Sequence, residues 1–193
     1  MRMIWAIMIL GLLACESAQV PTPRPRQFPR LDLPDRGYKI YEGEDCPFTI
    51  EVPQVAEVIK KEYLFGEIEA SPCWFDVAVT PLNATIHCSY YKIDKDQRLD
   101  KLVDDAYTMA SKHNQKASFR EEYEIKTKEA SGMIFKINGP VATPYQFYVT
   151  DSVRHFFRGS LYFDKKVDAD SIAPVITYIE DDVDYMLRSL SWQ

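Results

Sequence analysis

The sequence is poor in glycine and histidine, and it has no excess of positive charge. Only seven glycines and three histidines occur among 193 residues, and the common phosphate-binding, nucleophile-elbow and metal-ligating motifs are missing. The net charge of −6 argues against a nucleic-acid-binding protein, because such proteins need a basic surface. No apolar run reaches the roughly 18 residues that a membrane-spanning helix needs. These absences leave a globular protein with no predicted metal or cofactor.

An export signal is what the sequence does have at its N-terminus. Arg2 precedes an apolar stretch, Met3–Leu13, that is too short to cross a bilayer. Leu12–Cys15 resembles a bacterial lipobox, in which the cysteine thiol receives a diacylglycerol and the new amine is acylated. We therefore expect residues 1–14 to be a signal peptide and Cys15 to be the lipid attachment site, which holds the chain on a membrane surface. The alternative is a plain secretory signal that ends in cysteine by chance.

Residues 15–36 contain the lipidated cysteine and a proline- and arginine-rich tether. Proline fixes φ and removes backbone donors, so this stretch favours an extended chain. Its prolines and arginines are Pro21, Pro23, Pro25, Pro29, Pro34, Arg24, Arg26, Arg30 and Arg36. The arginines allow attraction to anionic lipid head groups or docking on a partner, although a solubilising stalk is the preferred interpretation. Phe28, Leu31 and Leu33 indicate that the later half packs on the domain.

Residues 37–193 are predicted to form a single globular domain. They carry 18 basic and 26 acidic residues, a net charge of −8. An acidic body behind a basic stalk fits a folded domain that is tethered to a membrane.

Three cysteines remain after Cys15. Cys46 and Cys73 each stand beside a proline at the start of a strand-like run, and an exported protein meets an oxidising compartment. We predict a Cys46–Cys73 disulfide, with a Cys73–Cys88 bridge across a hairpin as the second choice. Cys88 alternates with apolar residues on one strand and is expected to be a buried thiol.

Most of the domain is expected to consist of short strands joined by hairpins. Period-two alternation and turn residues favour strands at Thr49–Val52, Trp74–Val79, Ala84–Ile93, Phe119–Lys126, Met133–Ile137, Tyr145–Thr150 and His155–Phe163. Thr80–Asn83 and Asp151–Ser152 are the clearest turns. A weaker helical spacing predicts a short helix or turn at Val55–Phe65.

Two amphipathic helices complete the pattern. Apolar residues recur every three or four positions over Arg98–Gln115 and over Ile172–Leu190. Asp168 or Asp170 can cap the second helix, and Pro174 is tolerable only in its first turn. Strands, helix, four strands and helix predict an α+β fold, an antiparallel sheet with two main helices packed on it. The element order is similar to that of Mog1/PsbP-like sandwiches.

Catalytic signals are weak. His87, His113 and His155 fall on separate elements, and a Cys88/His87 pair would point to opposite faces of one strand. An envelope hydrolase that uses Cys88 and His155 is kept only as an alternative, and the chain is predicted not to be an enzyme. Four acidic residues crowd the last helix, Glu180, Asp181, Asp182 and Asp184. A solvated acidic face is preferred there over a metal site.

The hairpin near residue 151 carries the densest interaction signal. Asp151, Arg154, His155 and Arg158 cluster beside aromatic residues, and arginine and aromatic side chains supply much of the binding energy at interfaces. The simple alternative is strand alternation, with Phe157 in the core and the arginines outside. Two short segments also resemble the Asp-Ser/Thr-aliphatic O-glycosylation motif of Bacteroidetes, at Ser152 and Ser171.

Several segments together resemble the GldD family of gliding-motility lipoproteins from Bacteroidetes. They are Cys15 behind a short signal, Pro25–Pro34, Asp45–Phe48, Pro72–Phe75, Ile86–Tyr90, Gln146–Phe163 and Ala169–Pro174. The resemblance covers essentially the whole chain. Cys88 departs from the family pattern, in which an apolar residue is usual, and this supports leaving Cys88 out of the disulfide.

The resemblance implies a non-catalytic lipoprotein of the cell envelope that is needed for gliding motility or type IX protein secretion. It implies a membrane anchor at Cys15 and other gliding or type IX secretion proteins as partners. We expect attachment to the outer membrane on its periplasmic side. It transfers no catalytic residue. The alternative to an interaction module, besides a hydrolase, is a carrier of lipid or another small ligand in a cavity between sheet and helix.

Overall fold

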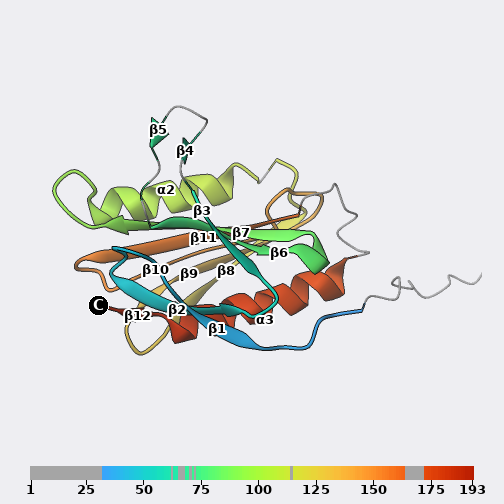
Figure 1. Cartoon of the computed structure of the whole chain (residues 1–193). Helices are drawn as coiled ribbons and strands as arrows, with labels where there is room; N and C mark the ends of the chain where they lie inside the picture. Colours follow the sequence, from blue (N-terminus) through green and yellow to red (C-terminus); the bar gives the residue numbers. More distant parts are fainter. Residues whose placement is uncertain are drawn as a thin grey trace, which may run out of the picture.

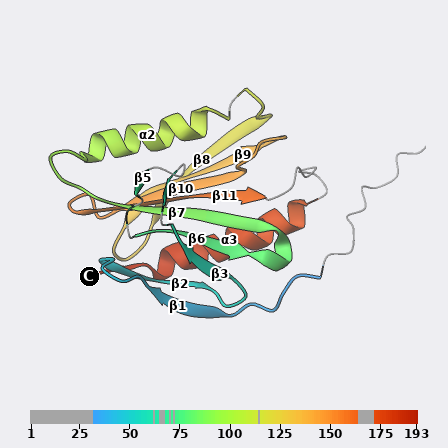
Figure 2. The same cartoon turned by 45° about the horizontal axis from the view of Figure 1, so that its top comes forward.

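The computed structural model describes residues 32–61, 63–64, 68–69, 71, 73–113, 115–163 and 172–193. It has three layers (Figures 1 and 2): helix α2 on one side, a large sheet in the middle, and helix α3 with a small sheet on the other side. None of the helices in these ranges has the length and apolar character needed to span a membrane. The prediction of an antiparallel α+β fold with two helices packed on the sheet is confirmed.

The large sheet has seven antiparallel strands in the order β3-β6-β7-β11-β10-β9-β8. Their bounds are Glu57–Lys60 (β3), Trp74–Val79 (β6), Ala84–Lys92 (β7), Phe119–Lys126 (β8), Ser131–Asn138 (β9), Tyr145–Thr150 (β10) and His155–Phe163 (β11). The 3₁₀ turn η2, Thr80–Leu82, joins β6 to β7, and Asn83 follows it in the left-handed conformation. Both predicted hairpins are therefore present, because the polar turn residues separate runs with strong period-two alternation.

A second sheet, in the order β1-β2-β12, packs beside α3. Its strands are Tyr38–Glu42 (β1), Phe48–Pro53 (β2) and Ser191–Trp192 (β12). Two-residue strands β4 (Tyr63–Leu64) and β5 (Ile68–Glu69) form a separate small ladder. Sequence reasoning found β2 but missed β1, whose side chains are mostly exposed, and β12, which is too short to show a period.

Each face of the large sheet has its own hydrophobic core, because successive strand residues point to opposite faces. The core on the α3 side includes Phe48, Phe75, Ile86, Phe147, Phe157, Ile179 and Met186. The core on the α2 side includes Leu102, Ala106, Ala110, Phe135, Ile137, Tyr148 and Phe156. Burial of one large apolar side chain stabilises the fold by roughly 1.5–3 kcal/mol, so both cores hold the central strands in place.

Helix α2 spans Leu99–Ser111 and is shorter at its end than the predicted Arg98–Gln115. The chain leaves the helix at Lys112, and the backbone N–H of His113 donates to Ala110 O over 3.3 Å. The His113 ring then lies 2.7 Å from Thr143 Oγ1, through its Nε2 atom. This contact carries the chain away from the helical path toward β8.

Helix α3 spans Ala173–Ser189, with Pro174 in its first turn as predicted. Its N-cap residue is Ile172, which makes no side-chain capping hydrogen bond. The predicted capping residues Asp168 and Asp170 lie outside the described residues.

The prediction of a helix or turn across Val55–Phe65 is wrong over its central part, which is strand β3. Lys60 pairs with Phe75 and Val58 with Val77, so β3 extends the sheet beyond β6. Only Val58 is half-buried, whereas Ile59 is 44% exposed. The apolar residues of Val55–Phe65 thus match a weak helical period only by chance. Pairing with the edge of β6 makes the central part of this segment a strand.

Candidate functional site

An open groove lies at one end of the large sheet and is called the aromatic groove below. It has a volume of about 570 Å³, within the range of roughly 300–1,000 Å³ that ligand sites occupy. It is lined by Asp45, Pro47, Ser71, Cys73, Trp74, Tyr90, Tyr91, Lys92, Asp94, Asp96 and Gln97. These residues come from the β1–β2 turn, the start of β6, the end of β7 and the loop before α2.

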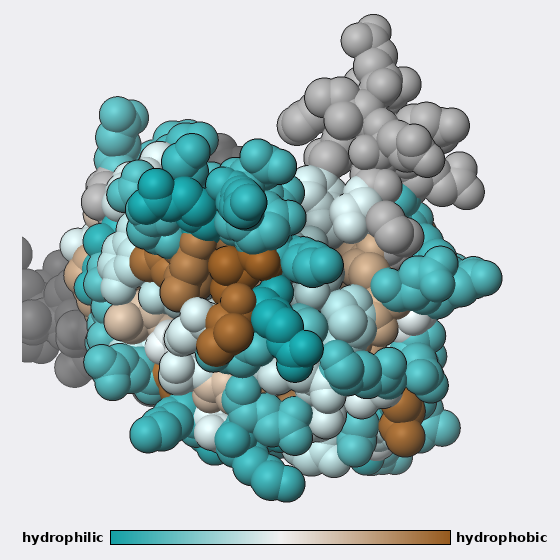
Figure 3. All heavy atoms as spheres, turned by 90° about the vertical axis from the view of Figure 1, so that its left-hand side faces the viewer, coloured by the Kyte–Doolittle hydropathy of each residue, from teal (hydrophilic) through white to brown (hydrophobic). Residues whose placement is uncertain are grey.

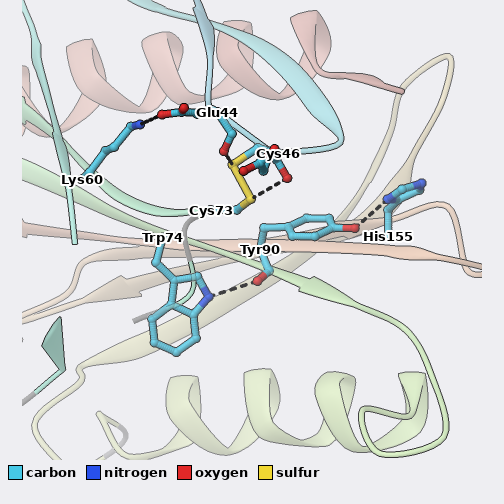
Figure 4. Close-up of a disulfide and its surroundings, with 8 residues drawn as sticks. Glu44, Cys46, Lys60, Cys73, Trp74, Tyr90 and His155 are labelled. Atoms are coloured by element: carbon cyan, nitrogen blue, oxygen red, sulfur yellow. Dashed lines mark hydrogen bonds and ion pairs between the residues drawn. A yellow bond between two sulfur atoms is a disulfide. The ribbon is translucent and has the colours of Figure 1, made fainter. Parts of the chain in front are cut away.

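The Cys46–Cys73 disulfide forms one wall of the aromatic groove (Figure 4). The two Cα atoms are 5.4 Å apart, within the usual range for a disulfide. The bond fastens the β1–β2 turn to the start of β6. Both half-cystines are buried, at 4% and 3% exposure. The wall is therefore fixed in place before any ligand arrives.

Two aromatic rings, those of Trp74 and Tyr91, form the floor of the groove. The indole Nε1–H of Trp74 donates to Tyr90 O over 3.0 Å, and the Trp74 ring meets the edge of the Tyr91 ring with 5.3 Å between centroids. Tyr91 is in turn held by Arg158, whose Nη2 donates to the Tyr91 hydroxyl over 2.7 Å. The Arg158 guanidinium also lies 4.8 Å from the centre of the Tyr91 ring. Such rigid, amphipathic rings are typical binding surfaces.

The rim of the groove is acidic. Asp45, Asp94 and Asp96 stand against one cation, Lys92, among the lining residues. Asp94 organises the rim, because its Oδ1 accepts the backbone N–H groups of Asp96 and Gln97, each over 2.8 Å. These hydrogen bonds hold the pKa of Asp94 below its ordinary value. Asp94 therefore keeps its negative charge to a lower pH than an ordinary aspartate does.

Behind the floor, Tyr90 and His155 form a buried pair (Figure 4). The Tyr90 hydroxyl lies 2.8 Å from His155 Nδ1, and the His155 ring stacks on Trp192 with 4.9 Å between centroids. Burial lowers the pKa of His155 and raises that of Tyr90, so burial favours the neutral form of both groups. The pair supports the floor and ties β12 to it.

The structure does not join Asp151, Arg154, His155 and Arg158 into the single exposed patch that was predicted. Asp151 Oδ1 accepts the backbone N–H groups of Val153, Arg154 and His155 and so closes the turn. His155 is 5% exposed and points to the α3 side, whereas Arg158 lies on Tyr91 on the α2 side. Strand alternation separates them. Two of the four residues still contact groove residues, His155 at Tyr90 and Arg158 at Tyr91.

The hydrolase alternative is not supported by the positions of Cys88 and His155. On neighbouring strands Cys88 pairs with Gly159 while His155 pairs with Lys92, so four residue positions, or about 13 Å, separate them along the ladder. Cys88 is a free, buried cysteine at 2% exposure, as expected. Burial raises the pKa of its thiol, which opposes formation of the reactive thiolate.

The carrier alternative needs a large apolar cavity between sheet and helix. The space beneath α2, lined by Ala106, Met109 and Phe135 among others, measures only about 10 Å³, about the minimum that one water molecule needs. A larger cleft of about 460 Å³ lies between α3 and strands β8 and β9, but its lining mixes apolar with charged side chains, among them Glu121, Lys136 and Glu180. Among the residues that the structure describes, no group of three or more histidine, cysteine or acidic side chains could hold a metal ion.

The acidic residues of α3 form the predicted solvated face only in part, because Asp181 is exposed whereas Asp182 is buried. Each of the four has a partner. Glu180 lies 2.6 Å from Lys136 Nζ, Asp181 accepts from Arg36 over 2.8 Å, Asp182 accepts from Tyr38 over 2.8 Å, and Asp184 accepts from Tyr145 over 3.0 Å. The sequence could not reveal these partners, which come from β1, β9, β10 and the chain before β1.

The chain just before β1 belongs to the domain. Arg36 lies 4.7 Å from the centre of the Tyr178 ring, and the Tyr178 hydroxyl donates to Pro34 O over 2.9 Å. Arg36, which was assigned to the tether, thus contacts α3 through Asp181 and Tyr178. Leu33 is 40% exposed. Cys15 lies outside the described residues, as do Phe28 and Leu31.

Of the two candidate O-glycosylation sites, only Ser152 can be examined. It is exposed at the hairpin tip, has a φ of 64°, and its backbone N–H donates to Thr150 Oγ1 over 2.9 Å. Ser171 lies outside the described residues.

Fold and groove together define an α+β sandwich domain with an aromatic, acid-rimmed groove at one end. Residues 18–192 match the model of the family described as gliding motility lipoprotein GldD. The chain belongs to this family, and it is a gliding motility lipoprotein. The match begins after Cys15 and covers nearly all of the domain.

Other comparisons add a structure of low similarity. The solution structure of cyanobacterial PsbP (CyanoP) from Synechocystis sp. PCC 6803 matches with a TM-score of 0.46 and 11% sequence identity, over 83% of this chain and 95% of that one. No curated protein matches the chain significantly.

Proposed function

We propose that this lipoprotein is a non-catalytic interaction module of the bacterial cell envelope that supports gliding motility, type IX protein secretion or both. The observation that carries the proposal is the aromatic groove, whose rings are preorganised by a disulfide and by hydrogen bonds from Trp74 and Arg158. A rigid aromatic floor with a charged rim suits recognition of a protein segment, since aromatic anchors supply affinity and charges supply selectivity.

The surface around this end of the molecule agrees with a reversible interaction. Figure 3 shows small patches of apolar surface separated by hydrophilic side chains. Interfaces of proteins that also exist alone have this mixed character, whereas obligate interfaces are more apolar. The proposed partners are other envelope proteins of the gliding or type IX secretion machinery.

Lipid attachment at Cys15 is the second part of the proposal. Two or more acyl chains would hold the protein firmly on a membrane, for which we propose the periplasmic side of the outer membrane. The signal peptide would be residues 1–14, and the Pro/Arg-rich chain would space the domain from the lipid surface. Ser152 and Ser171 are proposed O-glycosylation sites.

A deletion strain tests the proposed function. We expect loss of gliding or of type IX secretion, rescue by the wild-type chain, and no rescue by Cys15→Ser at equal protein level. Normal motility and secretion in the deletion strain would refute the proposal, and full rescue by Cys15→Ser would refute the role of the anchor.

A further inference from the structure

We propose that the aromatic groove binds the proline- and arginine-rich segment, residues 21–31, of a neighbouring copy of this chain. The inference deepens the proposed interaction role, because it names a surface and its occupant. This segment has no acidic residue. It contains four prolines and three arginines, namely Pro21, Pro23, Pro25, Pro29, Arg24, Arg26 and Arg30.

The chemistry of groove and segment is complementary. Proline-rich chains favour an extended polyproline II helix, and such helices dock in grooves lined by aromatic side chains. Trp74 and Tyr91 supply that lining and are held at a fixed angle by their edge-to-face contact. Proline rings can pack on the exposed parts of these two half-buried side chains at little entropic cost, since proline-rich chains favour an extended conformation.

Charge complementarity supplies the second argument. Asp45, Asp94 and Asp96 outnumber the two cations at the groove, Lys92 and the Arg158 that lies on Tyr91. All charged side chains of the segment are positive. Asp94 is fixed by two backbone hydrogen bonds, whereas the Asp96 carboxylate is exposed and makes no side-chain hydrogen bond or ion pair within the described part of the chain. Asp96 is thus well placed to meet an arginine of an incoming segment.

The direction of the chain favours a neighbouring copy over the same copy. The groove lies at the β1–β2 turn, whereas the N-terminal chain enters β1 from the opposite end of that strand (Figures 1 and 2). The entering chain is fixed there, because Arg36 binds Asp181 and Pro34 accepts from Tyr178. A segment of the same copy would have to turn back along β1. Copies anchored on one membrane surface face no such reversal, and anchoring raises their effective concentration.

Binding of a synthetic peptide tests the inference directly. The target is the chain from residue 16 onward, and the probe is a fluorescent peptide of residues 20–33, followed by anisotropy at low salt. We expect saturable binding that weakens with salt, because arginine–carboxylate attraction is screened. Asp96→Lys should weaken binding at least fivefold. Asp104→Lys, a matched change at an exposed aspartate on α2, should change it less than twofold.

The peptide and the intact chain provide two further controls. A peptide with all three arginines replaced by glutamine should bind at least fivefold more weakly. The chain should self-associate in sedimentation as its concentration rises, and Arg24→Gln/Arg26→Gln/Arg30→Gln should abolish this.

Three results would overturn the inference. One is the absence of binding to a correctly folded chain, and another is equal binding by the Asp96→Lys and Asp104→Lys variants. The third is a chain that stays monomeric and binds the peptide only after its own arginines are replaced, which would mean docking within one copy. Each of these leaves the deletion test of the proposed function unaffected.

Discussion

Replacing Cys46 and Cys73 together with serine removes the bond that holds the wall of the aromatic groove. The two half-cystines are 27 residues apart in sequence. The chain-entropy relation then gives a loss of about 3.5 kcal/mol in the free energy of unfolding. Replacing both residues avoids a lone reactive thiol, and serine preserves most of the side-chain volume.

Urea denaturation at neutral pH measures this change. For a slope of about 2 kcal/mol per M, the midpoint should fall by roughly 1.5–2 M. Reduction of the wild-type chain should give a similar shift, and Cys88→Ala should lose as much stability on reduction as the wild type, because Cys88 is a free cysteine outside the disulfide. The disulfide also joins the β1–β2 turn to β6, so the double variant should bind the segment peptide more weakly.

Two results would refute this reasoning. One is a loss below about 1 kcal/mol in the double variant, because chain entropy alone requires more. The other is a free Cys46 thiol in the native protein, found by mass mapping after non-reducing digestion, since the pairing Cys73–Cys88 would then replace the one described above.

Three further substitutions test individual contacts. Asp151→Ala should cost about 1–2 kcal/mol at pH 7, because three backbone N–H groups lose their acceptor. Burial raises the pKa of Asp151, but those hydrogen bonds outweigh burial and lower it overall. The stabilisation by the Asp151 carboxylate is therefore present above the pKa of the unfolded state, near 3.9, and is lost as pH falls through the pKa of the folded state. Stability curves of wild type and variant should therefore converge at acid pH, and a constant difference would contradict the assignment. Tyr38→Phe should cost about 1–3 kcal/mol in urea denaturation, since Asp182 is only 2% exposed and loses its donor. Tyr185→Phe, which removes a contact to Glu51 from a 40% exposed ring, should stay within about 0.5 kcal/mol, and equal losses would argue against a buried role for Tyr38. Gly159→Ala should cost about 1–3 kcal/mol, because its Cβ would overlap the Phe147 ring in the core. Thermal melting measures this loss, with Gly37→Ala as the control, because its Cβ would meet only the flexible side chain of Gln54. An unchanged melting temperature for Gly159→Ala would show that the strands can move apart to accommodate the methyl group.

The sequence predicted those elements whose period was long and regular. Strands β6, β7, β10 and β11 and both main helices follow from alternation or from three- and four-residue spacing. Strand β3 could not be found in this way, because it is held by pairing with β6 and buries few side chains. Strand β12 has two residues and is defined by its partner β2.

The functional site was harder to predict because it is assembled from distant segments. Trp74, Tyr91 and Asp94 belong to three elements and meet only after β6 pairs with β7. The Asp151–Arg158 cluster drew attention for its composition, yet it contributes from behind the groove through His155 and Arg158. A local signal was present in Pro72–Phe75, where tryptophan follows the half-cystine.

The acidic residues of α3 illustrate the same limit. Their crowding suggested solvent exposure, but Asp182 is buried and Glu180 is paired with Lys136. The partners stand roughly 40 to 145 residues away in sequence. Spacing along one helix carries no information about such partners, and only the packing of α3 against the sheets supplies it.

The central claim is that this lipoprotein acts through the aromatic groove. Its most direct test is the secretion and gliding of a deletion strain that expresses Asp96→Lys or Asp104→Lys at equal level and with equal thermal stability. The account predicts rescue by Asp104→Lys and clear loss of function for Asp96→Lys. Full rescue by both variants would contradict it.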